Sequence, residues 1–177
     1  MSASPTESPS AATSTSAPAA SLITLGANGV GSNKFGTPEA TVEGFLNAHL
    51  GKPDDSVVGV VCEFDSASPY ARQLSYGGVH LSFQSKAKGT TKSPRTLTGW
   101  LVQLEEPMVG FTLASPLPLK TTYTDLKTAF PKGTLDELQL GEGSSFWVFT
   151  TPDGVWYRGE DEDAPSEVGA GPQSACE

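Results

Sequence analysis

The first regular pattern along the chain is a run of apolar residues at helical spacing. They recur every three or four positions, as on one face of an α-helix. These residues are Val42, Phe45, Leu46 and Leu50. Thr37 suits the N-cap, Pro38 suits the first helical position, and Gly51 favours a left-handed end. The pattern predicts a helix of about three turns over residues 38–49.

A second copy of this pattern lies 84 positions further along the chain. The matched positions are Phe35, Thr37, Val42 and Leu46 in the first copy, and Leu119, Thr121, Leu126 and Phe130 in the second. Thr122 with Asp125 has the form of a capping box, and Pro131 ends this helix one turn earlier. Self-similarity at a constant offset predicts a structural repeat.

Segments of strand-like composition follow each helix. After the first helix we expect strands at 57–64, 70–76, 79–83 and 97–104, and after the second at 138–140, 146–150 and 155–158. The predicted fold class is α+β, with two repeats of a short helix packed on an antiparallel sheet. The repeats span about 21–104 and 105–158 and join into one curved sheet.

The first hairpin can be paired by hand, because Gly77 and Gly78 form a two-residue turn between alternating strands. The pairs are Tyr76 with Val79, Ser75 with His80, Leu74 with Leu81, and Gln73 with Ser82. One face is then apolar. The other carries Gln73, Ser75, His80 and Ser82 and is predicted to meet solvent.

The second hairpin turns at residues 151–154, where Pro-Asp-Gly is ordinary turn chemistry. Pairing Thr150 with Val155 places Trp147, Phe149, Trp156 and Arg158 on one face and Phe146, Val148 and Tyr157 on the other. Both faces are apolar or aromatic, so two interpretations stay open. The first set is either a binding platform of aromatics and arginine or the core face of the sheet.

The run Phe35-Gly36-Thr37, Val42, Phe45-Leu46 and Leu50-Gly51-Lys52-Pro53 resembles the opening of a family of envelope repeats. Members include secreted β-lactamase inhibitory proteins, small lipoproteins of outer-membrane assembly and actinobacterial lipoproteins. The second copy resembles it only loosely, because it lacks the glycine before Thr121 and the Leu-Gly-x-Pro end. The resemblance implies a helix on a four-stranded sheet in each repeat, and a concave face that binds a protein.

Residues 1–20 are almost entirely Ser, Thr, Ala and Pro, which leaves nothing large to bury, so we expect a disordered tether. They lack the charged and apolar regions of a signal peptide, and no apolar run is long enough to span a membrane. The chain is therefore either cytosolic or the mature region of an exported protein. Tethers of this composition favour an extracytoplasmic protein, secreted or lipid-anchored to the cell envelope.

The net charge of −9 is concentrated near the C-terminus. Residues 159–177 carry no basic residue and six acidic ones: Glu160, Asp161, Glu162, Asp163, Glu167 and Glu177. We expect this segment to be a solvated acidic tail, and an acidic chain is a poor partner for nucleic acid. The acidic run also lacks the spacing of a calcium loop, so we expect no metal.

Two cysteines, Cys62 and Cys176, lie far apart and outside any C-x-x-C pair. Cys176 lies in a polar tail with no apolar role, so we predict a disulfide that ties the tail to the domain. In the chain-entropy model such a bridge stabilises by roughly 4–5 kcal/mol. Two unrelated thiols are the alternative.

Catalytic motifs are weak. No nucleophile elbow, phosphate-binding loop or dinucleotide fingerprint is present. His49 ends a predicted helix, and His80 beside Ser75 has no acid to orient it. We therefore expect a non-enzymatic, cofactor-free, monomeric domain that binds a protein through the outer face of its sheet, as an inhibitor or in assembly. The candidate binding residues are Trp147, Phe149, Trp156, Arg158, His80 and Ser75. A cell-wall or carbohydrate-binding module with exposed tryptophans is the alternative, and a hydrolase the third reading.

Overall fold

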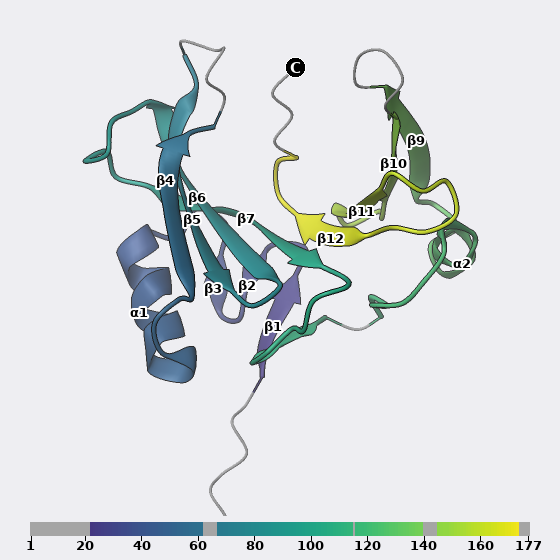
Figure 1. Ribbon diagram of the computed structural model, residues 1–177, viewed down its shortest axis with the longest axis horizontal. Coiled ribbons are helices and arrows are strands. Elements are labelled where there is room, and N and C mark those ends of the chain that lie inside the picture. The colour runs from purple at the N-terminus through teal and green to yellow at the C-terminus, as the bar shows by residue number, and fades with distance from the viewer. Residues whose placement is uncertain (1–21, 62–66, 115, 140–144, 174–177) are drawn as a thin grey trace, which may run out of the picture.

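The computed structural model describes residues 22–61, 67–114, 116–139 and 145–173 (Figure 1). The broad prediction of an α+β fold is confirmed, since two helices lie against two sheets. The helices are α1 (Glu39–Leu50) and α2 (Tyr123–Ala129). The strands are β1 (Ile23–Gly26), β2 (Gly29–Val30), β3 (Asn33–Lys34), β4 (Asp55–Val60), β5 (Pro69–Tyr76), β6 (Val79–Lys88), β7 (Thr96–Gln103), β8 (Phe111–Leu113), β9 (Thr134–Gln139), β10 (Ser145–Thr150), β11 (Val155–Gly159) and β12 (Glu167–Ala170).

The larger sheet has eight strands in the order β4-β5-β6-β7-β12-β11-β10-β9. Each helix precedes four consecutive antiparallel strands, β4 to β7 after α1 and β9 to β12 after α2. The two four-stranded halves meet where β7 pairs with β12. Figure 1 shows that the sheet curves, so that its two outer strands rise on the same side.

Strand β12 departs from the predicted organisation, which ended the domain at residue 158 and assigned 159–177 to an acidic tail. Glu167 to Ala170 instead pair with β11 on one edge and with β7 on the other. The acidic run precedes this strand and forms the connection from β11. Val168 and Ala170 are buried against the core. The short Val-Gly-Ala sequence therefore forms a central strand, although it is too short to show a strand pattern.

The two helix starts differ in their capping. Thr122 Oγ1 accepts from the backbone N–H of Asp125, whose side chain accepts from the Thr122 N–H, so the predicted capping box is confirmed. At α1 the N-cap is Pro38, and no side chain caps the helix. The prediction of Thr37 as N-cap is wrong, because the Thr37 carbonyl accepts from Leu97 while Pro38 bridges to Thr96 in β7.

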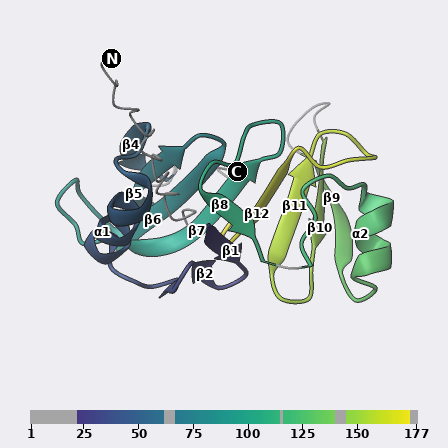
Figure 2. The same ribbon diagram turned by 90° about the horizontal axis from the view of Figure 1, so that it is seen from below.

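A second, small sheet was not predicted. Its order is β3-β2-β1-β8, with β1 and β8 parallel and the other pairs antiparallel. Figure 2 shows it beneath the middle of the large sheet, beside β7. The indole Nε1 of Trp100 in β7 donates to the carbonyl oxygen of Gly26 at 2.8 Å, which joins the two sheets through the core.

The hydrophobic core lies on the convex side of the curved sheet. Helices α1 and α2 cover its two halves on that side, and the small sheet lies between them (Figure 1). Buried residues from all of these elements form one cluster, which includes Leu25, Leu46, Trp100, Leu126 and Tyr157. The concave side therefore remains as the second face of the sheet.

The first hairpin has the predicted register. Tyr76 pairs with Val79, Ser75 with His80, Leu74 with Leu81 and Gln73 with Ser82. The second hairpin is shifted by one residue, because Thr150 pairs with Trp156 rather than Val155. Thr151 pairs with Val155 through its backbone N–H and its hydroxyl, which closes a three-residue turn in place of the expected four.

Gly169 generates a test of the central strand. A Cβ at this position would lie 2.7 Å from the carbonyl oxygen of Trp100 and closer still to the ring of Trp156. We expect Gly169→Ala to lower the free energy of unfolding by about 1–3 kcal/mol through overpacking. Urea denaturation measures the change.

Gly44 provides the matched control, because a Cβ there meets nothing within 4 Å in the middle of α1. Gly44→Ala should raise the free energy of unfolding by about 0.5–1 kcal/mol. If both substitutions changed the free energy of unfolding by the same small amount, the packing of Trp156 over β12 would be contradicted.

Candidate binding face

The concave side of the large sheet is the candidate functional surface. Side chains of the first half that alternate away from the core come from Gln73 and Ser75 of β5, His80 and Ser82 of β6, and Leu101 and Gln103 of β7. In the second half the same face carries Trp156, Arg158 and Glu167. We call these nine residues the concave face.

A shallow cleft of about 90 Å³ lies at the centre of this face. Gln73 and Ser82 line it from the first half, and Trp156 and Arg158 from the second. The chain after β12 also reaches it, because Gln173 is part of its lining. The cleft therefore spans the junction between the two halves of the sheet.

Arg158 is held in place by several contacts on the concave face. Its Nη2 lies 2.6 Å from Oε2 of Glu167, and its Nε donates to the same oxygen at 3.0 Å. The guanidinium also stacks over the rings of Phe146 and Trp156, with its carbon 5.6 Å and 5.5 Å from the two ring centroids. An arginine fixed by an ion pair and two rings loses little conformational entropy on binding a partner.

A larger cleft of about 470 Å³ lies at the outer end of β11. Phe146 and Arg158 line it together with three acidic residues, Glu160, Asp161 and Glu167. The acidic connection between β11 and β12 thus borders the concave face rather than forming a free tail. Its chemistry suits a partner that carries basic side chains.

The six predicted binding residues do not all lie on one face. Ser75 and His80 face each other on the concave side, with Oγ and Nδ1 2.9 Å apart, and Trp156 and Arg158 lie on the same side. Trp147 and Phe149 point to the core, where Phe149 is fully buried. Their assignment to the platform is wrong, because the one-residue shift of register turns β10 over relative to β11.

Trp156 lies on the concave face but is only 5% exposed. Its ring packs over Gly169, and its Nε1 donates to the carbonyl oxygen of Gly171 at 3.1 Å. The chain has two other tryptophans. Trp100 is buried, and Trp147 is half-buried against the core. An exposed tryptophan platform is therefore absent, and Arg158 is the prominent residue of the predicted set.

Glu167, Leu101 and Gln103 belong to the concave face but were missed in the sequence. Leu101 and Gln103 alternate with the buried Trp100 and Val102, a signal that would have located them. Glu167 was assigned to the acidic tail, because a strand as short as β12 shows no distinctive pattern in the sequence.

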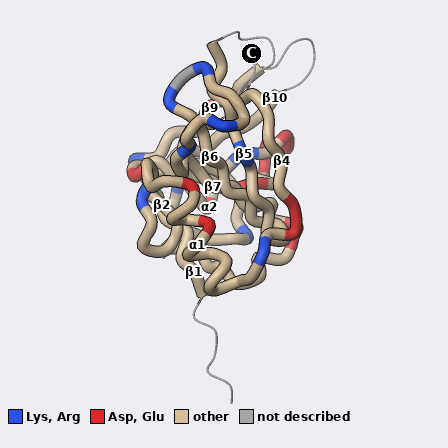
Figure 3. Tube along the Cα trace, turned by 90° about the vertical axis from the view of Figure 1, so that its left-hand side faces the viewer, with Lys and Arg blue, Asp and Glu red and all other residues tan. Residues whose placement is uncertain are grey.

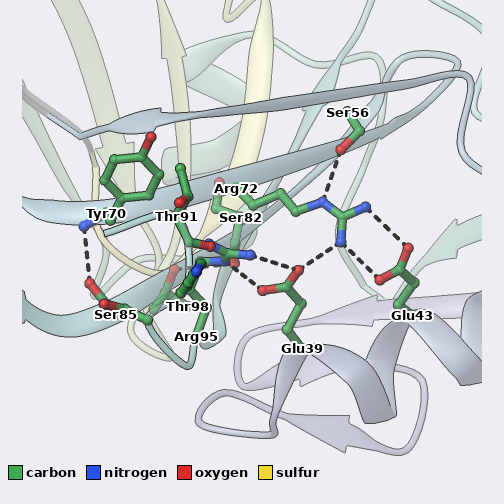
Figure 4. A network of polar contacts seen from close by, with 12 residues as sticks. Glu39, Glu43, Ser56, Tyr70, Arg72, Ser82, Ser85, Thr91, Arg95 and Thr98 are labelled. Carbon is green, nitrogen blue, oxygen red and sulfur yellow. Dashed lines mark hydrogen bonds and ion pairs between the residues drawn. The ribbon is translucent and has the colours of Figure 1, made fainter. Parts of the chain in front are cut away.

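A dense charge network lies on the opposite, convex side (Figure 4). Glu39 of α1 accepts from Arg95 at 2.6 Å and from Arg72 of β5 at 2.7 Å. Arg72 also binds Glu43 at 2.9 Å and Ser56 of β4 at 2.9 Å. Every charge of this network has a partner within it, so we assign it to the docking of α1 on the sheet rather than to ligand binding.

The charged groups of this network shift the pKa of Glu39. Burial acts to raise that pKa, but the hydrogen bonds and charges of Arg95 and Arg72 outweigh it, and the pKa lies below its usual value. Tyr76, also on the convex side, has its pKa raised to about 12, chiefly by burial and then by the charge of Glu43. Neither group is thereby suited to acid–base chemistry near neutral pH.

The described part of the chain contains no group of three or more histidine, cysteine or acidic residues that could hold a metal ion. None of its helices has the length and apolar character needed to cross a membrane. The predicted disulfide between Cys62 and Cys176 lies outside the described residues.

No family model matches the chain, and no curated protein or solved structure is detectably similar to it. The resemblance to envelope repeats thus stays a prediction from the residues that carry it.

The Glu39 network predicts a pH-dependent contribution to stability. A carboxyl whose pKa is lowered on folding stabilises above its unfolded pKa, near 4.5, and this contribution is lost as the pH falls through the folded value. We expect Glu39→Gln to lower the free energy of unfolding by about 1–3 kcal/mol at pH 7, because both arginines lose a charged partner. The difference from wild type should shrink between pH 5 and pH 3 in urea denaturation.

Asp136→Asn is the control, since Asp136 is exposed on β9. It should change the free energy of unfolding by no more than about 0.5 kcal/mol at pH 7. A Glu39→Gln difference that stays constant over this pH range would contradict the network's electrostatic role.

Proposed function

We propose that this chain is a non-catalytic domain that binds a protein through its concave face, as an inhibitor or an assembly factor outside the cytoplasm. The observation that carries the proposal is the separation of the two faces of the sheet. Both helices and the small sheet cover the convex side, while no described helix or strand lies over the concave side (Figure 1). A curved, polar sheet face without a covering element is a suitable surface for a folded partner.

The composition of the concave face supports this proposal. Half-buried polar side chains such as Ser75, His80 and Gln103 lie on the same face as the central cleft. Arg158, which stacks on two rings, has the character of an interface hot spot. The acidic cleft at its edge adds charge that would select a partner with a basic rim.

The carbohydrate-binding alternative depends on exposed tryptophan rings. Trp100 and Trp156 are buried, and Trp147 packs against the core. The observed burial therefore favours a protein over a sugar polymer as the ligand.

We also infer that the two halves are copies of one repeat. Both have the order of a helix and four antiparallel strands, and their last strands, β7 and β12, pair antiparallel at the junction. Val42 and Leu126, which the offset of 84 positions relates, are both buried in the core. Duplication of one unit explains why β4 and β9, the first strand after each helix, form the two outer edges of the sheet.

Binding through the concave face can be tested with immobilised protein and an extracellular extract of the source organism. Gln73→Arg with Gln84→Arg adds two long charged side chains on the concave side. Gln73 is an exposed residue of β5, and Gln84 is a half-buried residue of β6 that alternates to the same side as Ser82. We expect these changes, and separately Arg158→Ala, to lower the recovery of a specific partner at least about tenfold, because they disturb the contact surface. Quantitative mass spectrometry measures the recovery.

Lys127→Glu with Thr128→Arg, on the exposed side of α2, is the matched control and should leave recovery unchanged. Parallel capture on insoluble cell-wall polysaccharide should fail for every variant. Equal recovery by the wild type and the concave variants, or strong retention on polysaccharide, would contradict the proposal.

An oxidised Cys62–Cys176 bridge is expected if the chain works outside the cytoplasm. Non-reducing peptide mass spectrometry should detect the linked peptide in protein folded under oxidising conditions, with no alkylated thiol. Two alkylated cysteines in the native protein would rule the bridge out.

A further inference from the structure

The chain turns toward the concave side where β12 ends. Gly171 has a φ of 95°, a conformation that favours glycine, and a Cβ there would collide with the carbonyl oxygen of Thr98 in β7. Pro172 has no N–H with which to extend the pairing of β12 with β7. The chain therefore leaves the plane of the sheet, and Figure 1 shows it rising between the two raised halves of the sheet.

The described end of the chain lies at the central cleft of the concave face. The indole Nε1 of Trp156 donates to the carbonyl oxygen of Gly171 at 3.1 Å, which fixes the direction of the turn. Gln173 is half-buried and shares the cleft lining with Gln73 of β5 and Ser82 of β6. The segment after β12 thus already contributes one wall of the cleft.

The length of the chain that follows keeps it near this cleft. Residues 174–177 continue directly from Gln173, and four residues extend by at most roughly 14 Å. They cannot reach the convex side from this point without passing over the concave face or over an edge of the sheet. We call residues 172–177 the cover segment.

The cleft and the cover segment have matching chemistry. Among the described residues that line the cleft, Arg158 is the only charged one. The lysines of the first half gather instead at the end of β6 and on its connection to β7 (Figure 3). The cover segment has no charge before Glu177, and the small side chains of Ser174 and Ala175 suit a shallow cleft.

We propose that the cover segment occupies the central cleft and competes with the partner for the concave face. The competition, but not the covering, rests on the proposed function. A segment tethered this closely has an effective concentration of about 1 mM or more, so an intrinsic affinity of about 1 mM keeps the cleft covered at least about half of the time. The partner binds only the uncovered fraction, and its apparent affinity falls accordingly.

NMR of a chain that ends at Gly171 tests the covering. Residues 172 and 173 take part in no strand pairing, so the shortened chain keeps every described strand, and circular dichroism checks its fold. Compared with the full chain, the amide signals of Gln73 and Ser82 should shift, because both residues share the cleft with Gln173. The amide of Asp136 on β9 is the control and should not shift.

The missing segment can also be supplied as a separate molecule. A peptide of residues 172–177, with serine in place of Cys176, should return the Gln73 and Ser82 signals of the shortened chain toward those of the full chain at about 5 mM. The full-length variant Cys176→Ser should show the full-chain signals, which separates the covering from any bridge made by that cysteine.

Partner recovery from the extracellular extract tests the competition. The shortened chain should recover about two- to tenfold more of the protein that Arg158→Ala loses, because its cleft is always open. Cys176→Ser should recover the same amount as the wild type.

Unshifted Gln73 and Ser82 amides, or a Cys176→Ser variant that behaves like the shortened chain, would overturn the covering and leave the proposed function standing. Shifted amides with unchanged recovery of a partner that Arg158→Ala still loses would overturn the competition alone. If neither the shortened chain nor Arg158→Ala changed recovery, the competition and the proposed function would both fail, and only the covering would stand.

Discussion

The whole architecture depends on one short strand, β12, which pairs with β7 on one side and with β11 on the other. Without it β7 and β11 would each have an unpaired edge in the middle of the molecule, and burying such backbone groups is costly. Gly169 has no side chain, and the ring of Trp156 packs over it while Val168 and Ala170 point to the core. A larger residue at Gly169 would separate the tryptophan from the strand.

The continuous sheet in turn decides which surfaces are available. Because both helices and the small sheet lie on the convex side, that side contains the hydrophobic core and the Glu39–Arg72–Arg95 network. The concave side retains polar groups and the stacked Arg158. The outer strands differ too, since β9 carries two acidic side chains in its middle, whereas β4 has only Asp55 at its start.

How well the strand register was predicted depended on the turn and on the alternation of apolar and polar residues in each hairpin. The Gly77-Gly78 turn admits one loop length and one alternation, so the first hairpin was predicted residue by residue. In the second hairpin both faces are apolar, and alternation therefore could not choose the register. The Thr151 hydroxyl, which accepts from Val155 N–H, shortened the turn and moved Trp147 and Phe149 to the core. A side-chain hydrogen bond of this kind is not visible in a hydrophobic pattern.

The sequence by itself determined the two helices, most of the strands and the polar face of the first hairpin, because these depend on local spacing and turn chemistry. Only the tertiary structure decided where β12 lies, that β1 and β8 pair across more than eighty residues, and that Arg158 stacks between Phe146 and Trp156. Short strands such as β12 and β8 have too few residues to show a period. They form because a distant strand offers unpaired backbone groups and a buried surface, and that information lies in the assembled fold.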